Sequence, residues 1–85
     1  MPEEKIILND GTEYNGSLME SSGTLWLFLE PGQMASYFDK LNDPVNTIRI
    51  THINWGTATV YAGYNHLYWI KEEPNKNITA GFVKV

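Results

Sequence analysis

Apolar and polar residues alternate along this chain in short segments, and the dominant period is that of a β-strand. The clearest example is Thr24–Leu29, where the three leucines share one face of a strand while Trp26 and Phe28 share the other. Because both faces are apolar, such a strand is either covered on both sides or presents an aromatic face to a partner.

The other predicted strands are bounded by short turn signals. Asp10-Gly11 lies between two β-prone runs and predicts a hairpin with a type I′ turn. Asn15-Gly16 interrupts the next segment and predicts a bulge or a second turn. We expect the remaining strands at Lys5–Leu8, Glu13–Met19, Asn46–Ile53, Thr57–Tyr64, Leu67–Glu72 and Ile78–Val85.

The period changes once, between Gln33 and Leu41. Four apolar residues there recur at i, i+3, i+4 and i+7, which is the stripe of a helix that docks on a sheet. Asn42-Asp43-Pro44 ends the segment, since proline cannot continue a helix. The stripe consists of Met34, Tyr37, Phe38 and Leu41.

These elements predict one mainly β domain over residues 1–85. The order is β-β-β-α-β-β-β-β, with about seven short antiparallel strands and one short helix near residues 33–41, because short turns between consecutive strands favour antiparallel pairing. A domain of this size curls into a small barrel or a sandwich to protect its edge strands.

Charge and composition narrow the range of partners. The net charge is −4, and the six basic residues are scattered, whereas nucleic-acid-binding proteins usually carry a basic stripe. The longest apolar run is far shorter than the roughly 20 residues of a membrane span. The acidic N-terminus lacks the apolar core of a signal peptide, and there is no cysteine. We therefore expect no nucleic acid and no membrane as partners, and an intracellular location unless the chain is exported inside a larger assembly.

Candidate catalytic chemistry is sparse. His52 and His66 are the only histidines. His52 lies on a predicted strand, whereas His66 lies in the short turn before the next one, and no glycine-rich phosphate loop or calcium loop is present. We predict no enzyme, no cofactor and no metal site. A hydrolase that uses His52 or His66 with a carboxylate is the weakest alternative.

Aromatic side chains are the strongest candidates for function. Trp and Tyr fill cores, but they are also enriched at protein interfaces and stack on sugars. Because Tyr68 and Trp69 are adjacent in one strand, we expect their rings to point to opposite faces. The interaction candidates are Trp26, Phe28, Trp55, Tyr64, Tyr68 and Trp69.

Several segments carry a resemblance to a known group. These are Lys5–Thr12, Leu25–Leu27, the helix with Met34 and Phe38, Asn42-Asp43-Pro44, and Val60–Tyr64. Together they resemble small uncharacterised proteins encoded by phages and prophages of Gram-positive bacteria, typically among virion genes. The resemblance implies a virion-associated or tail-type structural protein and supplies no catalytic residues.

Two functional hypotheses follow. The first is a non-enzymatic structural or interaction protein that acts by self-association or by docking to other proteins, including virion proteins. The alternative is a small carbohydrate-binding module, whose signature would be exposed coplanar aromatic rings bordered by Asn, Asp or Glu.

Overall fold

The computed structural model describes residues 4–31, 34–71 and 78–84. Within the helix, it describes side chains only from Phe38 onward. Over these described residues it confirms a mainly β fold, with seven antiparallel strands in one sheet and one short helix in the expected order. The elements are β1 (Glu4–Ile7), β2 (Glu13–Ser21), β3 (Thr24–Leu29), α1 (Met34–Leu41), β4 (Arg49–Asn54), β5 (Thr57–Ala62), β6 (His66–Lys71) and β7 (Ile78–Val83).

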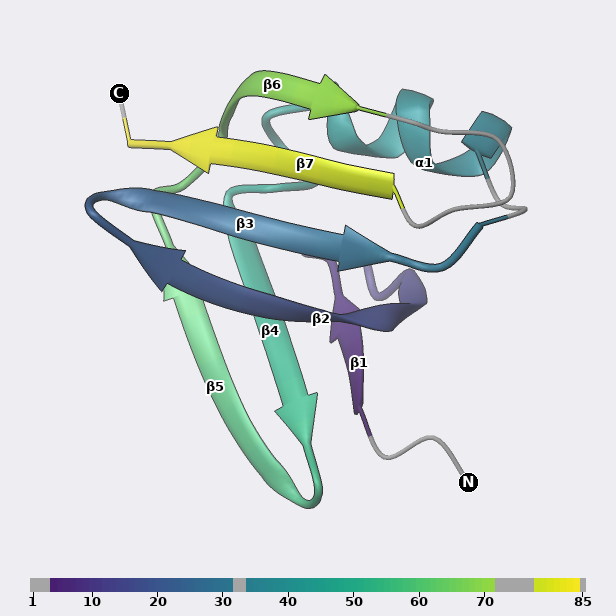
Figure 1. The fold of residues 1–85 in the computed structure, drawn as a ribbon, viewed down its shortest axis with the longest axis vertical. Coiled ribbons are helices and arrows are strands. Elements are labelled where there is room, and N and C mark those ends of the chain that lie inside the picture. The colour runs from purple at the N-terminus through teal and green to yellow at the C-terminus, as the bar shows by residue number, and fades with distance from the viewer. Residues whose placement is uncertain (1–3, 32–33, 72–77, 85) are drawn as a thin grey trace.

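The strands form one sheet in the order β5-β4-β1-β2-β3-β7-β6. Figure 1 shows that β4 and β5 run steeply across the view, whereas β3, β7 and β6 run nearly at right angles to them. The sheet therefore consists of two crossed halves. The steep half contains β5, β4 and β1, the other half contains β3, β7 and β6, and β2 belongs to both.

Gly16 marks the position where β2 changes partner. Asn15 pairs with Lys5 of β1, whereas Gly16 pairs with Leu29 of β3. A Cβ atom on Gly16 would lie 2.3 Å from the carbonyl oxygen of Phe28. Only glycine allows the two backbones to approach this closely. Of the bulge and the second turn predicted as alternatives at Asn15-Gly16, the turn is wrong, because β2 continues through both residues.

The core lies between the two crossed halves. Alternation in β3 is regular, and its three leucines are fully buried. They face residues of β7 across the ladder, with Leu27 opposite Ala80. Fully burying a leucine, isoleucine or phenylalanine stabilises a fold by about 1.5–3 kcal/mol. The buried apolar side chains are Ile6, Leu8, Tyr14, Leu18, Leu25, Leu27, Leu29, Leu41, Ile50, Ile78, Ala80 and Phe82.

The helix follows its predicted stripe only in part. Leu41 is buried, but Phe38 is 46% exposed, so its assignment to the buried stripe is wrong. A helix of eight residues has little over two turns. Among its described side chains, only the last one, Leu41, reaches the core. Gln33 and the side chains of Met34 and Tyr37 lie outside the description. Among the described residues, no helix has the length and apolar character to cross a membrane.

The first hairpin forms, but with a different turn. Gly11 donates to the carbonyl oxygen of Leu8 at 3.0 Å, and Gly11 has a φ of 90°. Asp10 does not have the positive φ that the predicted type I′ turn requires. The loop is instead a three-residue connection, in which a glycine in the left-handed region follows a tight turn.

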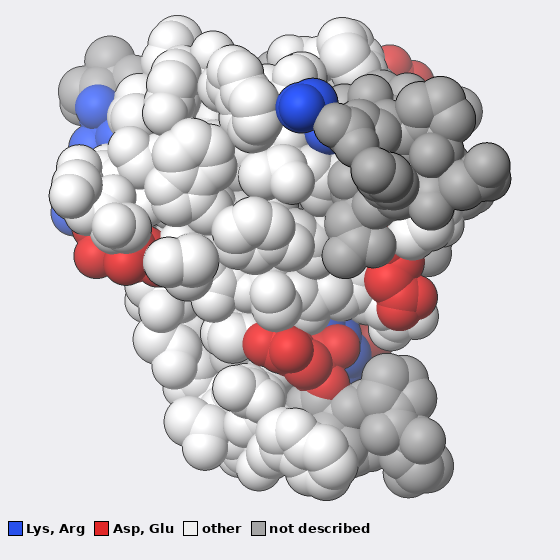
Figure 2. Space-filling view, in the orientation of Figure 1, with Lys and Arg blue, Asp and Glu red and all other residues white. Residues whose placement is uncertain are grey.

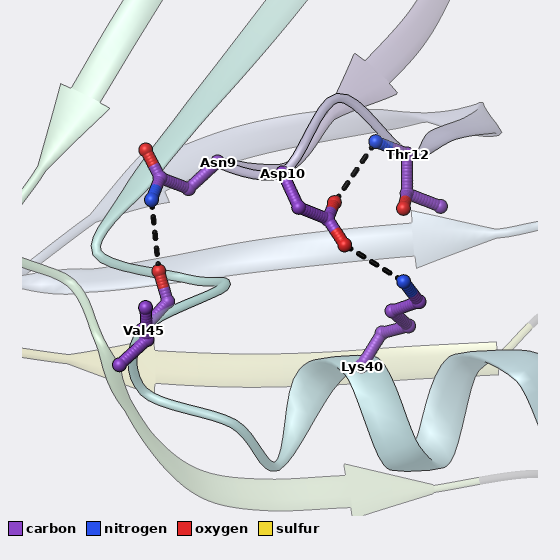
Figure 3. A network of polar contacts seen from close by, with 5 residues as sticks. All are labelled: Asn9, Asp10, Thr12, Lys40 and Val45. Atoms are coloured by element: carbon purple, nitrogen blue, oxygen red, sulfur yellow. Dashed lines mark hydrogen bonds and ion pairs between the residues drawn. The ribbon is translucent and has the colours of Figure 1, made fainter.

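Polar contacts fasten this loop to the end of α1 (Figure 3). The Asp10 carboxylate accepts a bond from the Thr12 amide at 2.9 Å and from Lys40 Nζ at 2.7 Å. Asn9 Nδ2 donates to the carbonyl oxygen of Val45 at 3.0 Å. The hydrogen bond from Lys40, followed by those from Thr12, holds the pKa of Asp10 well below its usual value, and the Asp10 carboxylate raises the pKa of Lys40.

We predict that Gly16→Ala destabilises the protein by about 1–3 kcal/mol, the usual cost of adding atoms to a packed site. The added methyl group would force β2 away from β3 at the position where β2 changes partner. Urea unfolding followed by circular dichroism measures this. Asn15→Ala, at the exposed neighbouring position, is the control and should change stability little.

Acid should weaken the contact between Asp10 and Lys40. The pKa of Asp10 is lower in the folded protein than its ordinary value of 3.8. The ionised carboxylate therefore stabilises the folded state above pH 3.8, and this stabilisation is lost as the pH falls further. Asp10→Asn keeps an acceptor for Thr12 but no charge for Lys40. We predict that the variant loses less stability than the wild type between about pH 5 and pH 2. If the free energy of unfolding fell equally with pH in the two proteins, the stabilising contact between Asp10 and Lys40 would be contradicted.

Candidate functional site

Three aromatic rings gather on the outer side of the sheet, over β3, β6 and β7. The ring centroids of Trp26 and Trp69 are 5.7 Å apart with an interplanar angle of 77°. Those of Trp26 and Tyr68 are 6.1 Å apart at 65°. Edge-to-face pairs of this kind each contribute about 0.5–1.5 kcal/mol beyond the area they bury. Trp26 is therefore the centre of an ordered aromatic cluster.

A bulge in β6 brings the two neighbouring rings to the same side. Leu67 pairs with Phe82 and Trp69 pairs with Gly81, so Tyr68 is an extra residue in the ladder. An extra residue shifts the alternation of side chains. Tyr68 and Trp69 consequently both contact Trp26, and the expectation that they point to opposite faces is wrong.

Gly81 forms the floor beneath the rings. It lies opposite Trp26 on β3 and opposite Trp69 on β6. A Cβ atom at this position would lie 2.9 Å from Cζ3 of Trp26 and 3.2 Å from Cε1 of Tyr68. The missing side chain thus provides the space in which both rings pack against the strand.

The surrounding surface is apolar as well. Phe28 follows Trp26 on the same face of β3, and Met19 of β2 lies directly opposite Trp26 and is 49% exposed. Tyr68 is 49% exposed and Trp69 is 41% exposed. Figure 2 shows a broad uncharged area on this side, with acidic and basic residues at its margins. We call the surface of Met19, Trp26, Phe28, Tyr68 and Trp69 the aromatic face.

The two other aromatic candidates lie elsewhere. Trp55 occupies the turn between β4 and β5, is 76% exposed and has a φ of 50°. Bulky residues are rare in that backbone region, where Asn and Gly are preferred, so a tryptophan there is not explained by turn geometry. Tyr64 is half-buried, packs against Tyr61 and lies under the ammonium group of Lys84 at 4.8 Å.

The histidines are not brought together by strand pairing. His52 of β4 contacts Glu4, with 2.7 Å between Nε2 and Oε2. His66 begins β6, and the strands β1, β2, β3 and β7 separate β4 from β6 in the sheet. Across the described ranges, no group of three or more His, Cys, Asp or Glu residues could hold a metal ion.

The sequence prediction missed Met19 and Gly81 as parts of the site. Met19 lies between Ser17 and Ser21 on its face of β2, and only its register opposite Trp26 reveals its role. Gly81 carried a usable signal, because a glycine inside a strand often marks a close approach by another group.

Comparisons of the chain with protein-family models, with curated protein sequences and with solved structures find no match. The function is therefore inferred from the geometry of the aromatic face and from the sequence.

We predict that Gly81→Val disrupts the aromatic cluster, because its branched side chain would occupy the space of the Trp26 and Tyr68 rings. The near-ultraviolet circular dichroism signal should fall, and stability should drop by about 1–3 kcal/mol. Thr79→Ala, two residues away on the same face of β7, is the control and should leave the signal nearly unchanged. An unaltered spectrum in Gly81→Val would contradict the packing described.

Proposed function

We propose that this protein is a non-enzymatic interaction protein that docks onto another protein through the aromatic face. The observation that carries the proposal is the group of partly exposed rings held in fixed positions by the β6 bulge and Gly81. Interface hot spots are enriched in Trp and Tyr that are rigid before binding, since little side-chain entropy is then lost.

The composition of the face supports a protein partner. The core of a protein interface is depleted of charge and enriched in aromatic residues and methionine. Met19, Tyr68 and Trp69 are all exposed there, and the charged residues seen in Figure 2 lie around the area and not within its centre. This arrangement of an apolar centre and a polar rim is typical of a docking surface.

The geometry of the rings supports a carbohydrate ligand less well. Sugar rings would stack best on exposed rings that lie in one plane. Here Trp69 and Tyr68 each meet Trp26 at a steep angle, 77° and 65° respectively, so Trp26 forms no common plane with either ring. Carbohydrate binding remains the alternative that a glycan array would test.

We further propose that the partner belongs to a phage or prophage particle, so that the protein is a virion-associated, tail-type component. This setting is the one that the sequence resemblance implies. The products of the genes that flank this one are then the natural candidates for the partner.

The proposal predicts that one of these flanking gene products forms a complex with this protein. Each would be co-expressed with the wild type and analysed by size-exclusion chromatography and calorimetry. The double variant Tyr68→Ala, Trp69→Ala should weaken the complex by about 30-fold or more, since removal of one hot spot typically costs at least 2 kcal/mol.

Phe38→Ala is the matched control. Phe38 is 46% exposed, close to the exposure of Tyr68 and Trp69, but it lies on α1 and not on the sheet. A complex that is insensitive to the double variant, or one that Phe38→Ala weakens equally, would contradict docking through the aromatic face. Binding to sugars that depends on Trp69 would favour the carbohydrate alternative.

A further inference from the structure

The edge strand β5 is exposed in a way that no other described strand is. It pairs with β4 along its whole length, from Thr57 opposite Asn54 to Ala62 opposite Arg49, and with no other described strand. Of its six residues only Tyr61 is half-buried, and the remainder are exposed on both faces of the sheet. In Figure 1 it forms the outer border of the steep half of the sheet.

The direction of the backbone groups along β5 follows from its register. The Gly63 amide donates to the carbonyl oxygen of Ile48 at 3.2 Å, in line with the ladder between β4 and β5. In an antiparallel ladder, hydrogen-bonded and non-hydrogen-bonded pairs alternate. Thr57, Thr59 and Tyr61 therefore direct their backbone groups to β4. The alternate residues, Ala58, Val60 and Ala62, direct theirs to the open edge.

This edge lacks the features that usually prevent pairing. Natural edge strands are protected by charged residues, proline or bulges. β6, at the other end of the sheet, has the bulge at Tyr68 and ends in Lys71. The sequence of β5 is Thr-Ala-Thr-Val-Tyr-Ala, which contains no charge and no proline, and its ladder is regular.

We propose that β5 pairs with β5 of a second copy to form a two-fold symmetric, antiparallel dimer centred on Val60. In this register Val60 lies opposite Val60 of the second copy, and Ala58 lies opposite Ala62. By symmetry the Ala58–Ala62 pair occurs twice, so three pairs of residues face each other. Each pair exchanges two N–H···O hydrogen bonds, which gives about six in all. A register centred on Thr59 would use only Ala58 and Val60, so centring on Val60 satisfies more of the edge.

The same register gives the exposed tryptophan of the turn a neighbour. Continued beyond the strand, it brings Trp55 of one copy alongside residues 63–65 of the other, where Tyr64 is half-buried. One pair of six-residue strand edges and this contact should bury less than the roughly 1,200–2,000 Å² of a stable complex. The dimer is therefore weak and dissociates on dilution.

A cysteine-free chain allows a direct test by crosslinking. In the proposed dimer the two Val60 Cα atoms are about 5.5 Å apart, within the range for a disulfide. Val60→Cys should form a covalent dimer under mild oxidation at least about tenfold faster than Val45→Cys, which serves as the collision control. Val45 is 70% exposed in a loop and Val60 is 46% exposed, so accessibility alone favours the control.

Sedimentation velocity over a range of concentrations provides the second readout. The wild type and Val60→Thr should show a concentration-dependent dimer. Val60→Lys places two like charges at the two-fold axis and should remain monomeric at about tenfold higher concentration. Circular dichroism of Val60→Lys would confirm that the monomer is folded, as expected for an exposed position.

Equal crosslinking rates at positions 60 and 45 would overturn the proposal. So would a wild-type dimer that survives Val60→Lys, or one that is abolished by Trp69→Ala. The inference is independent of docking through the aromatic face, because Trp69→Ala should leave the β5 dimer intact. Failure of one proposal can therefore be distinguished from failure of the other.

Discussion

The change of partner of β2 at Gly16 is the constraint on which the rest of the structure depends. Since β2 pairs with β1 before this residue and with β3 from this residue onward, one continuous strand belongs to both halves of the sheet. The crossing of the halves creates the space that the leucines of β3 and the apolar residues of β1 and β7 fill. A flat sheet with the same strand order would leave the leucine face of β3 in water.

At two positions in this small domain, on opposite sides of the sheet, a glycine allows another group to approach the backbone closely. At Gly16 it allows backbone to approach backbone and so shapes the core, whereas at Gly81 it allows aromatic rings to rest on the strand. The second case couples fold to proposed function, because β7 is central in its half of the sheet and cannot easily shift. The rings of the aromatic face are thus supported by one of the best-anchored strands.

Much of the fold could be predicted from local pattern, and the arrangement of the site could not. The alternation in Thr24–Leu29 was sufficient to place the leucines on one face and Trp26 and Phe28 on the other, because strand periodicity is a local property. The common side of Tyr68 and Trp69 depends on an extra residue in the ladder with β7, which is set by pairing between distant segments. Phe38 was assigned to the core from helical period, but a helix this short buries few of its residues.

The position of β7 also bears on how the chain reaches its native state. This strand, Ile78–Val83, inserts between β3 and β6, so neither neighbour has its full set of backbone partners until residue 83 has been synthesised. Pairings of such high sequence separation slow folding. Until β7 has been synthesised, the leucines of β3 lack the core neighbours Ile78, Ala80 and Phe82. An incomplete sheet of this kind is open to premature association.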